Sequence, residues 1–425
     1  MKKLLPFLLC LVLAASVLVA CGNTDTPATE TEPEETINPL GDSVKTEATV
    51  TEAEPEETTP PVKTLNEADF DYFKVFKAPE GKPGDIIMDY MLKMAKIEWV
   101  AEESWNTTWK VQGDFGVNLS YEKGKTYYGI PYSQTKCGAS AFEIFIVDGK
   151  FNPHSPYYEE IIGNHCSSSM GLAYQQVLDF PYLGGLRENE YRKGLVKLAD
   201  GLEHPESRSE KPYDYISANV TAKNGTDKLY AAYASLVKGD ILYKMIDGSG
   251  HTRMVSKVEV NKSATGKILP SRSFIYCVEQ TNAWYDNNQN TTWWIDKKYT
   301  FEQLNSTNFT PYMLCILHEE NPVIQDAYVG MKGKNTAESL MKIVNGTIES
   351  TFPINLVRTT VKDSKGEIVA SAMKYDFQNT YKVNIRDTTY TLNIDKLPAG
   401  SYTFEIYVAI ARGGWTIESV DFTIA

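Results

Sequence analysis

Three polar side chains in the middle of the chain have the types that nucleophilic catalysis by a thiol requires. Cys166 opens an amphipathic segment, His251 lies at the start of a strand-like run over residues 250–260, and Glu279 lies in the next such run, residues 273–281. A thiol becomes a nucleophile when a base takes its proton, and a third group fixes the orientation of that base. The pattern predicts a thiol on a helix beside an imidazole and a carboxylate on neighbouring strands.

Cys166 stands where a helix would activate it. A thiol at the N-terminus of a helix feels the positive end of the helix dipole and nearby N–H donors, which lower its pKa and favour the thiolate. The backbone N–H of Cys166 is also suited to stabilise the oxyanion of a tetrahedral intermediate. The polar neighbours His165 and Ser167 to Ser169 favour an accessible thiol. The alternative is a small buried cysteine that begins a core helix.

Two residues are candidates for orienting the imidazole of His251. Glu279 and Gln280 are adjacent in a strand, so their side chains face opposite sides of the sheet. A carboxylate would stabilise the imidazolium, whereas an amide would only fix the ring. We take Glu279 as the first choice and Gln280 as the alternative. The competing interpretation of His251 is a partly exposed histidine at a strand start.

Hydrophobic periodicity indicates the elements that position these residues. Apolar residues at helical spacing predict helices over residues 84–97, 166–178 and 226–236. Three strand-like runs follow, "KGDILYKM", "GHTRMVSKVEV" and "SFIYCVEQT". A capping-box pattern at Thr300 and Gln303 begins a short helix, and "PYMLCILH" closes the sheet. Helices followed by antiparallel strands are typical of an α+β domain, which we assign to residues 66–321. Residues 181–216 are interpreted as an insertion near the site rather than as part of the core.

The segments "GIPY", "NHCSSSMGLAY", "KGDILYKMIDGSGHTRMVSKVEV" and "VEQTN" resemble the NlpC and CHAP families. These families are papain-like cysteine peptidases and amidases that cut amide bonds in peptidoglycan. The resemblance implies a papain-like fold in which Cys166 attacks, His251 serves as base and then as acid, and Glu279 orients it. It also implies that Tyr132 of "GIPY" lies near the oxyanion, with a packing aromatic as the alternative. Family members usually carry Asp-Cys-Ser-Gly at the nucleophile, and this chain does not.

An aromatic loop follows the strand of Glu279. Trp284, Tyr285, Trp293 and Trp294 are interspersed with asparagines, a composition suited to stacking on a sugar or lining a peptide cleft. We expect Trp284 to contact substrate, and core aromatics beside a polar loop are the alternative. The loop mimics the start of a calcium site but lacks the required Gly and distal Glu, so we predict no metal and no cofactor.

The last hundred residues have a different composition. Residues 322–425 contain several β-rich runs separated by "SKGE", "LPAG" and "ARGG", and they contain no long helical pattern. Short strands at this spacing predict an all-β sandwich. The segment resembles an immunoglobulin-like module, which by itself implies no function.

The N-terminus predicts where the protein works. Lys2 and Lys3 precede an apolar run that has the length of a signal sequence, and its end, residues 18–22, resembles the lipobox of bacterial lipoproteins. The resemblance implies that residues 1–21 are a signal peptide and that Cys21 becomes the lipidated N-terminus. Residues 22–65 carry eleven acidic residues against Lys45 and Lys63, so we expect a disordered spacer.

These features together predict a lipid-anchored hydrolase on the extracellular face of a bacterial cytoplasmic membrane. Its expected partner is peptidoglycan or another cell-wall polymer, cleaved at amide bonds of the stem peptide. The chain lacks basic clusters, so nucleic acid is not an expected partner. The alternative is an inactive wall-binding or adhesion lipoprotein on the same fold. The sequence predicts no oligomeric state.

Overall fold

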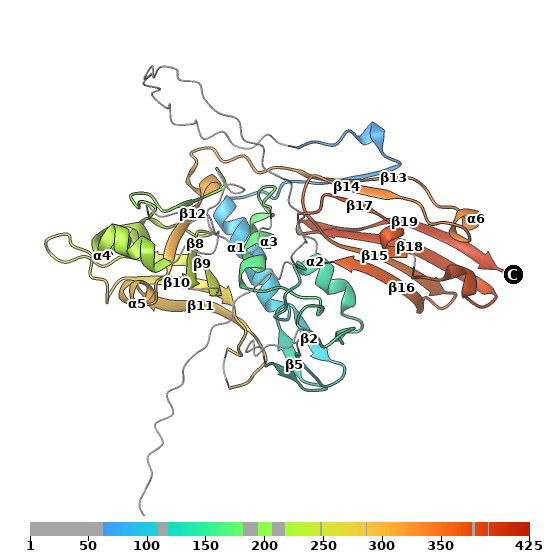
Figure 1. Cartoon of the computed structure of the whole chain (residues 1–425), viewed down its shortest axis with the longest axis horizontal. Coiled ribbons are helices and arrows are strands. Elements are labelled where there is room, and N and C mark those ends of the chain that lie inside the picture. The colour runs from blue at the N-terminus through green and yellow to red at the C-terminus, as the bar shows by residue number, and fades with distance from the viewer. Residues whose placement is uncertain are drawn as a thin grey trace, which may run out of the picture.

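The computed structural model describes residues 63–108, 118–181, 194–205 and 217–425, apart from residues 247–248, 286, 376–378 and 390. The expected signal peptide, the lipobox with Cys21 and the spacer up to residue 62 lie outside these residues. Within them, helices combine with antiparallel sheets, and the C-terminal part is rich in strands (Figure 1). This arrangement confirms a mixed α+β protein with a β-rich part.

The main sheet of the α+β part has the order β11-β10-β9-β8-β12-β7 among the described residues. All of its pairings are antiparallel. Its strands are β7 (Val196–Leu198), β8 (Ile241–Ile246), β9 (Ser249–Glu259), β10 (Phe274–Gln280), β11 (Trp293–Thr300) and β12 (Thr310–Leu314). Every residue of β12 is buried, because this strand lies inside the sheet and both faces of the sheet are covered.

Helices cover the two faces of this sheet separately (Figure 1). On one face, Met254 and Val278 join a core with α1 (Pro83–Lys96) and α3 (Cys166–Tyr174). On the other face, Val255 and Cys277 join a second core with α4 (Ser217–Ser235) and α5 (Phe301–Ser306). Successive residues of a strand point to opposite faces, so each strand contributes to both cores.

Local sequence signals explain where the helices begin and break. Pro83 opens α1, where its missing N–H costs nothing. Helix α4 is interrupted at Gly225, whose φ of 75° is not helical. The expected capping box is present at α5, because the Thr300 hydroxyl accepts from the Gln303 N–H at 3.0 Å and the Gln303 side chain accepts from the Thr300 N–H at 2.9 Å.

Three expectations about this part are corrected. Helix α3 ends at Tyr174, before residue 178. The segment 181–216 is not wholly outside the core, because β7 comes from it and forms an edge of the main sheet. Strand β12 is therefore inside the sheet, and the remainder of "PYMLCILH" forms the 3-10 turn η4 (Cys315–His318).

Smaller elements complete the α+β part around Trp99, which is 1% exposed. They are β2 (Glu98–Ala101), β3 (Trp105–Asn106), β4 (Ser120–Tyr121), β5 (Thr126–Tyr128), β6 (Lys150–Phe151), α2 (Ala139–Phe142) and η2 (Glu143–Phe145). The 3-10 turn η1 (Glu67–Asp69) instead comes directly before β1 (Tyr72–Phe76).

The C-terminal part is built from two sheets with the orders β1-β13-β14-β17 and β16-β15-β18-β19 among the described residues. Val329 and Ile348 of the first sheet share a core with Val357 and Phe404 of the second, so the sheets face each other as a sandwich. The elements are β1 (Tyr72–Phe76), β13 (Ala327–Lys332), β14 (Thr347–Ser350), β15 (Ile354–Asp363), β16 (Ile368–Tyr375), β17 (Lys382–Asn384), β18 (Gly400–Ile410), β19 (Gly413–Ile424), α6 (Ala337–Leu340), α7 (Arg386–Thr389) and η5 (Ile394–Lys396).

The boundary expected at residue 66 is corrected by β1. This strand precedes the α+β part in sequence, yet it pairs with β13 of the sandwich from Tyr72↔Met331 to Phe76↔Ala327. The two parts also share buried contacts, since Leu356 and Ala409 of the sandwich belong to the core of α1 and α3.

Candidate functional site

The start of α3 is held against the segment that contains Tyr132. A β-bridge joins Tyr132 to Asn164, and Asn164 donates its backbone N–H to the Pro131 carbonyl at 3.1 Å. Gly163 is required here, because a Cβ at this position would collide with the carbonyl of Pro131. The structure thus places Cys166 as the first residue of α3, with Tyr132 beside the start of the helix, as the sequence predicts.

The thiol of Cys166 is less accessible than its polar neighbours suggest. Cys166 is 8% exposed, and His165 is 2% exposed. The serines that follow are buried because they bond to the helix end: Ser168 Oγ accepts from the His165 N–H at 2.8 Å, and Ser169 Oγ donates to the Cys166 carbonyl at 2.9 Å. Burial, reinforced by the charge of Lys136, lowers the pKa of His165 to about 3, so its ring is neutral.

His251 and Glu279 are in direct contact on neighbouring strands. His251 Nε2 hydrogen-bonds to Glu279 Oε2, and the same oxygen accepts from Arg253 Nε at 3.0 Å. Tyr299 of β11 donates its hydroxyl to the other carboxylate oxygen. Glu279 is 1% exposed, so its charge is stabilised by these three side chains rather than by water.

The structure does not bring Cys166 and His251 together. The cross-strand register pairs His251 with Lys244 and Arg253 with Leu242, and Leu242 belongs to the core under α4 and α5. His251 also lies edge-on to Phe309 of that core, with ring centroids 6.2 Å apart. Helix α3, with Cys166, packs on the opposite face. The expected arrangement of thiol, imidazole and carboxylate is therefore corrected to two separate groups.

The alternation along β9 and β10 accounts for this correction. Thr252, paired with Tyr243, and Gln280, paired with Trp293, occupy the face that α3 covers. Gln280 donates to the Ile130 carbonyl at 2.8 Å, so the alternative orienting residue lies on the face of Cys166 but away from His251. A shift of one position in a strand moves a side chain to the other face. Thr252 therefore stands where an imidazole would be needed to face α3.

Trp284 is a packing aromatic. Its ring lies 5.1 Å from that of Tyr121 and 5.7 Å from that of Tyr127, centroid to centroid, in the core of the α1 side. This packing agrees with the alternative of a core aromatic beside a polar loop. Tyr132 is partly buried and stacks on Tyr158 at 5.7 Å, which agrees with the packing alternative.

A cavity of about 510 Å³ opens on the face of His251 instead. It is lined by His251, Arg253, Glu279 and Tyr299, by further residues of β8 and β11, by residues 281–283, and by α5 and the segment that follows it. Sequence reasoning missed Arg253, Tyr299, Lys244 and Phe309, and named Trp294 only as part of an aromatic loop. The spacing of His251 and Arg253, two positions apart in one strand, was the available signal that both share a face.

The charges at this cavity have shifted pKa values with identifiable causes. Burial alone would raise the pKa of Glu279, but the hydrogen bond from His251 and the charges of Arg253 and His251 lower it to about 2. Burial raises the pKa of Tyr299, and the negative charge of Glu279 adds to this effect, so Tyr299 remains a hydrogen-bond donor. Burial also lowers the pKa of Lys244, with a contribution from the charge of Arg253.

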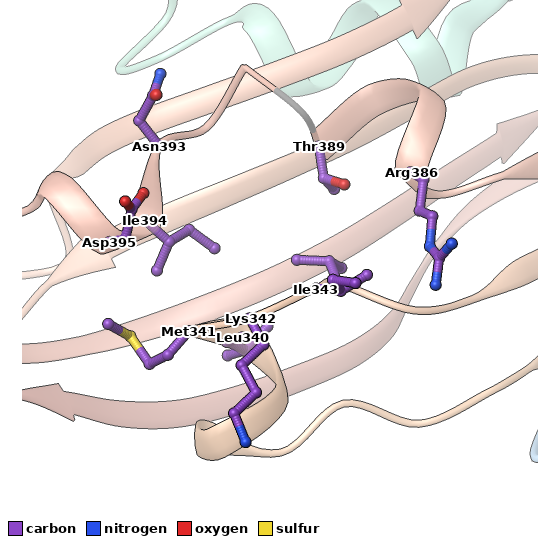
Figure 2. Close-up of a pocket in the computed structure, with 10 residues that line it drawn as sticks. Leu340, Met341, Lys342, Ile343, Arg386, Thr389, Asn393, Ile394 and Asp395 are labelled. Carbon is purple, nitrogen blue, oxygen red and sulfur yellow. The ribbon is translucent and has the colours of Figure 1, made fainter.

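A second cavity, of about 460 Å³, lies on the sandwich between the turn after α6 and the segment around η5 (Figure 2). Ile343, which is 51% exposed, and Met341, which is 38% exposed, contribute to its wall. Arg386 and Asp395 supply charge at different sides of the opening. None of its lining residues is a buried charged group, and we find no acid–base arrangement in it.

In the described part of the chain, no group of three or more His, Cys, Asp and Glu side chains is arranged to bind a metal ion. Among the same residues, no helix combines the length and the apolar character needed to cross a membrane. The cysteines Cys137, Cys166, Cys277 and Cys315 form no disulfide with one another.

Comparison of the chain with models of protein families, with curated proteins and with solved structures returned no match. A function must therefore be assigned from the fold, from Cys166 at the start of α3, and from the His251–Glu279 network with its cavity.

Proposed function

We propose that the protein is a surface lipoprotein that binds a cell-wall polymer in the cavity above Glu279 and does not cleave it. In this proposal the α+β part is a papain-like scaffold of the NlpC and CHAP type, and the C-terminal part is an immunoglobulin-like module. Cys21 carries the lipid, and the segment up to residue 62 spans the distance to the wall. Peptidoglycan or an attached polymer is the partner.

The observation that carries this proposal is the position of His251. Thiol-based hydrolysis needs a base within hydrogen-bond reach of the nucleophile. His251 and Cys166 lie on opposite faces of the main sheet. On the face of Cys166, the corresponding strand position holds Thr252, whose hydroxyl cannot serve as a base at neutral pH.

The adjacent histidine does not replace the missing base. His165 precedes Cys166, and burial lowers its pKa to about 3, far below the value useful for general-base catalysis near neutral pH. In contrast, the cavity combines apolar walls with a few converging polar groups, which is the usual character of a binding site.

Alkylation of the full-length protein tests the separation of thiol and imidazole. We expect iodoacetamide to modify Cys166 slowly below pH 8, at the same rate in the parent and in His251→Ala, because no imidazole assists the thiol. The adduct is located by mass spectrometry. Fast labelling below pH 8 that is lost in His251→Ala would establish a Cys–His pair and overturn the proposal.

Incubation with purified cell wall tests the function itself. The parent should sediment with insoluble wall, and neither the parent nor Cys166→Ala should release soluble fragments. Phe309→Ala removes an apolar wall of the cavity and should weaken sedimentation. Release of fragments by the parent but not by Cys166→Ala would restore the hydrolase, and absence of sedimentation would reject wall binding.

A further inference from the structure

The cavity above Glu279 carries more positive charge than its carboxylate neutralises. Lys244 and Arg253 line it, and Lys297 lies over the ring of Trp294 in its wall, 2.9 Å from the centroid. Among the described lining residues Glu279 is the only acid, and it is 1% exposed. The side chain of Arg253 is 14% exposed, whereas that of the carboxylate is 1% exposed. The whole chain has a net charge of −13, so a positive cavity is not a general property of this protein.

Arg253 presents a prepared hydrogen-bonding group. Its Nε donates to Glu279, and its guanidinium carbon lies 3.8 Å from the ring centroids of both Tyr299 and Phe309. The two rings fix the plane of the guanidinium. Its two terminal nitrogens donate to no side chain or carbonyl in the described part of the chain. A planar pair of free N–H donors matches the two oxygens of a carboxylate or phosphate.

Lys244 is a second cation without a carboxylate partner among the described residues. Its ammonium lies 5.7 Å from the ring centroid of Phe309. Burial and the charge of Arg253 lower the pKa of Lys244. Burial also lowers the pKa of Lys297. An anion bound between Arg253 and Lys244 would offset the electrostatic repulsion between these two cations.

Several other polar groups that line the cavity are already bonded to the protein. The Thr281 hydroxyl donates to the Ala283 carbonyl at 3.0 Å, and the Thr307 hydroxyl donates to the Gln303 carbonyl at 2.6 Å. The side-chain oxygen of Gln303 accepts from the Thr300 N–H. Asn282 also lines the cavity, as does the indole N–H of Trp294, which has no hydrogen-bond partner among the described residues. The charged groups left to contact a ligand, Arg253 and Lys244, are both donors.

We propose that this cavity holds an anionic group, a carboxylate or a phosphate, of a ligand whose apolar part lies against Trp294 and Phe309. The anion lies between Arg253 and Lys244. This inference rests on the proposed binding function and specifies its ligand. Carboxylates occur on peptides and phosphates on phosphodiester polymers, and both present the same paired oxygens to the guanidinium.

Thermal unfolding of the full-length protein in simple anions tests the site without any wall. We expect sodium phosphate or sodium acetate, at ionic strength matched with sodium chloride, to raise the Tm of the parent. In Lys244→Gln the apparent dissociation constant should be about tenfold weaker. Lys244 has no described carboxylate partner, so this change leaves no buried acid unpaired.

Lys298→Gln is the matched control. Lys298 is on β11 next to Lys297, but its ammonium lies 3.5 Å from the ring centroid of Phe274, outside the cavity lining. It should bind anions like the parent. The anion site is overturned if phosphate and acetate raise the Tm no more than chloride, or if Lys244→Gln and Lys298→Gln behave alike.

Chemically altered wall identifies the source of the anion. One sample has its carboxyl groups converted to amides, and another has its phosphodiester-linked polymers removed with hydrofluoric acid. Loss of sedimentation with one sample assigns the ligand to that class. Equal sedimentation with both samples and with untreated wall overturns the anionic ligand but leaves wall binding standing. If the protein sediments with none of the three wall samples, the proposed wall-binding function is rejected. A Tm that rises with phosphate or acetate would still support the anion site in that case.

Discussion

Glu279 accepts hydrogen bonds from three side chains while it is almost completely shielded from water. A buried carboxylate without such partners would be strongly destabilising. Its partners come from β9 and β11, the two strands beside its own strand β10. The carboxylate therefore links three neighbouring strands through side-chain hydrogen bonds at one end of the sheet. The same network fixes the orientation of Arg253 toward the cavity.

Glu279→Gln should lower stability at neutral pH by on the order of 3 kcal/mol, because it removes the charge that Arg253 and His251 surround. The pKa of Glu279 falls from the ordinary value of 4.5 to about 2 in the folded protein. The carboxylate therefore contributes stability above pH 4.5, and this contribution disappears as the pH falls toward 2. Urea unfolding at several pH values should show the parent and variant converging in that window.

Glu338→Gln is a suitable control for this experiment. Glu338 pairs with Lys342 at 2.7 Å on the surface, with its side chain 81% exposed, so its removal should cost less than about 1 kcal/mol. A difference between parent and Glu279→Gln that stays constant from pH 6 to pH 2 would contradict the role assigned to the carboxylate.

At the scale of elements, the segment before Tyr132 packs closely against β11 because it has a glycine, Gly129, at the point of contact. Gly129 has a φ of 83°, and a Cβ there would collide with the indole of Trp293, which donates to the Ile130 carbonyl at 3.0 Å. Gly124 has a similar φ of 79°, but no atom lies within 4 Å of a Cβ there. An alanine at Gly124 would therefore introduce backbone strain alone, whereas an alanine at Gly129 would introduce backbone strain and a steric clash.

Gly124→Ala should destabilise the protein by about 1 kcal/mol, since only the backbone conformation is disfavoured. Gly129→Ala should cost about 3 kcal/mol, because the displaced Trp293 adds an overpacking penalty. Denaturant unfolding measures both. Equal losses for the two variants would show that the contact between Gly129 and Trp293 is not tightly packed.

The sequence predicted the elements better than it predicted which side chains face one another. Strong periodicity identified α1 and the strands β8, β9 and β10, and the pairing of His251 with Glu279 follows from those strands being neighbours. The sequence of β9 does not reveal which face of the sheet His251 occupies. The adjacent residues Met254 and Val255 point to opposite faces, and both are apolar and buried. A sheet covered by helices on both faces has no polar side that would reveal its orientation.

Contacts distant in sequence were also not predictable. Strand β1 is short and carries no signal for its partner, β13, which follows more than two hundred residues later. The edge strand β7 lies in a segment whose charge and glycine content favoured a loop. Pairings of this kind depend on the whole fold rather than on local preference.

At the scale of the whole molecule, the α+β part and the sandwich are joined by buried polar and apolar contacts. The Gln176 side chain donates to the Ala411 carbonyl at 2.8 Å, and the Tyr407 hydroxyl donates to the Ser140 carbonyl at 2.8 Å. The Tyr381 hydroxyl donates to a carboxylate oxygen of Asp179 at 2.8 Å. Such contacts argue that the two parts unfold together.

We therefore expect one cooperative unfolding transition. Most tryptophans of the described chain belong to the α+β part, whereas far-ultraviolet circular dichroism also reports the sandwich strands. Both signals should give the same midpoint in urea. Two separate midpoints would mean that the shared contacts are too weak to couple the parts.

The route by which the chain enters the fold determines how a mechanical load would be carried. A pull on the N-terminal segment first meets the exposed ion pair of Lys63 with Asp179, 2.7 Å apart, which is a weak contact. It then reaches β1, where Tyr72 is bonded to Glu418 of β19 through its hydroxyl and β1 is paired with β13 through the backbone. Once that ion pair breaks, tension from that end is carried by the sandwich, and the cavity lined by Glu279 carries no direct load until β1 separates from β13.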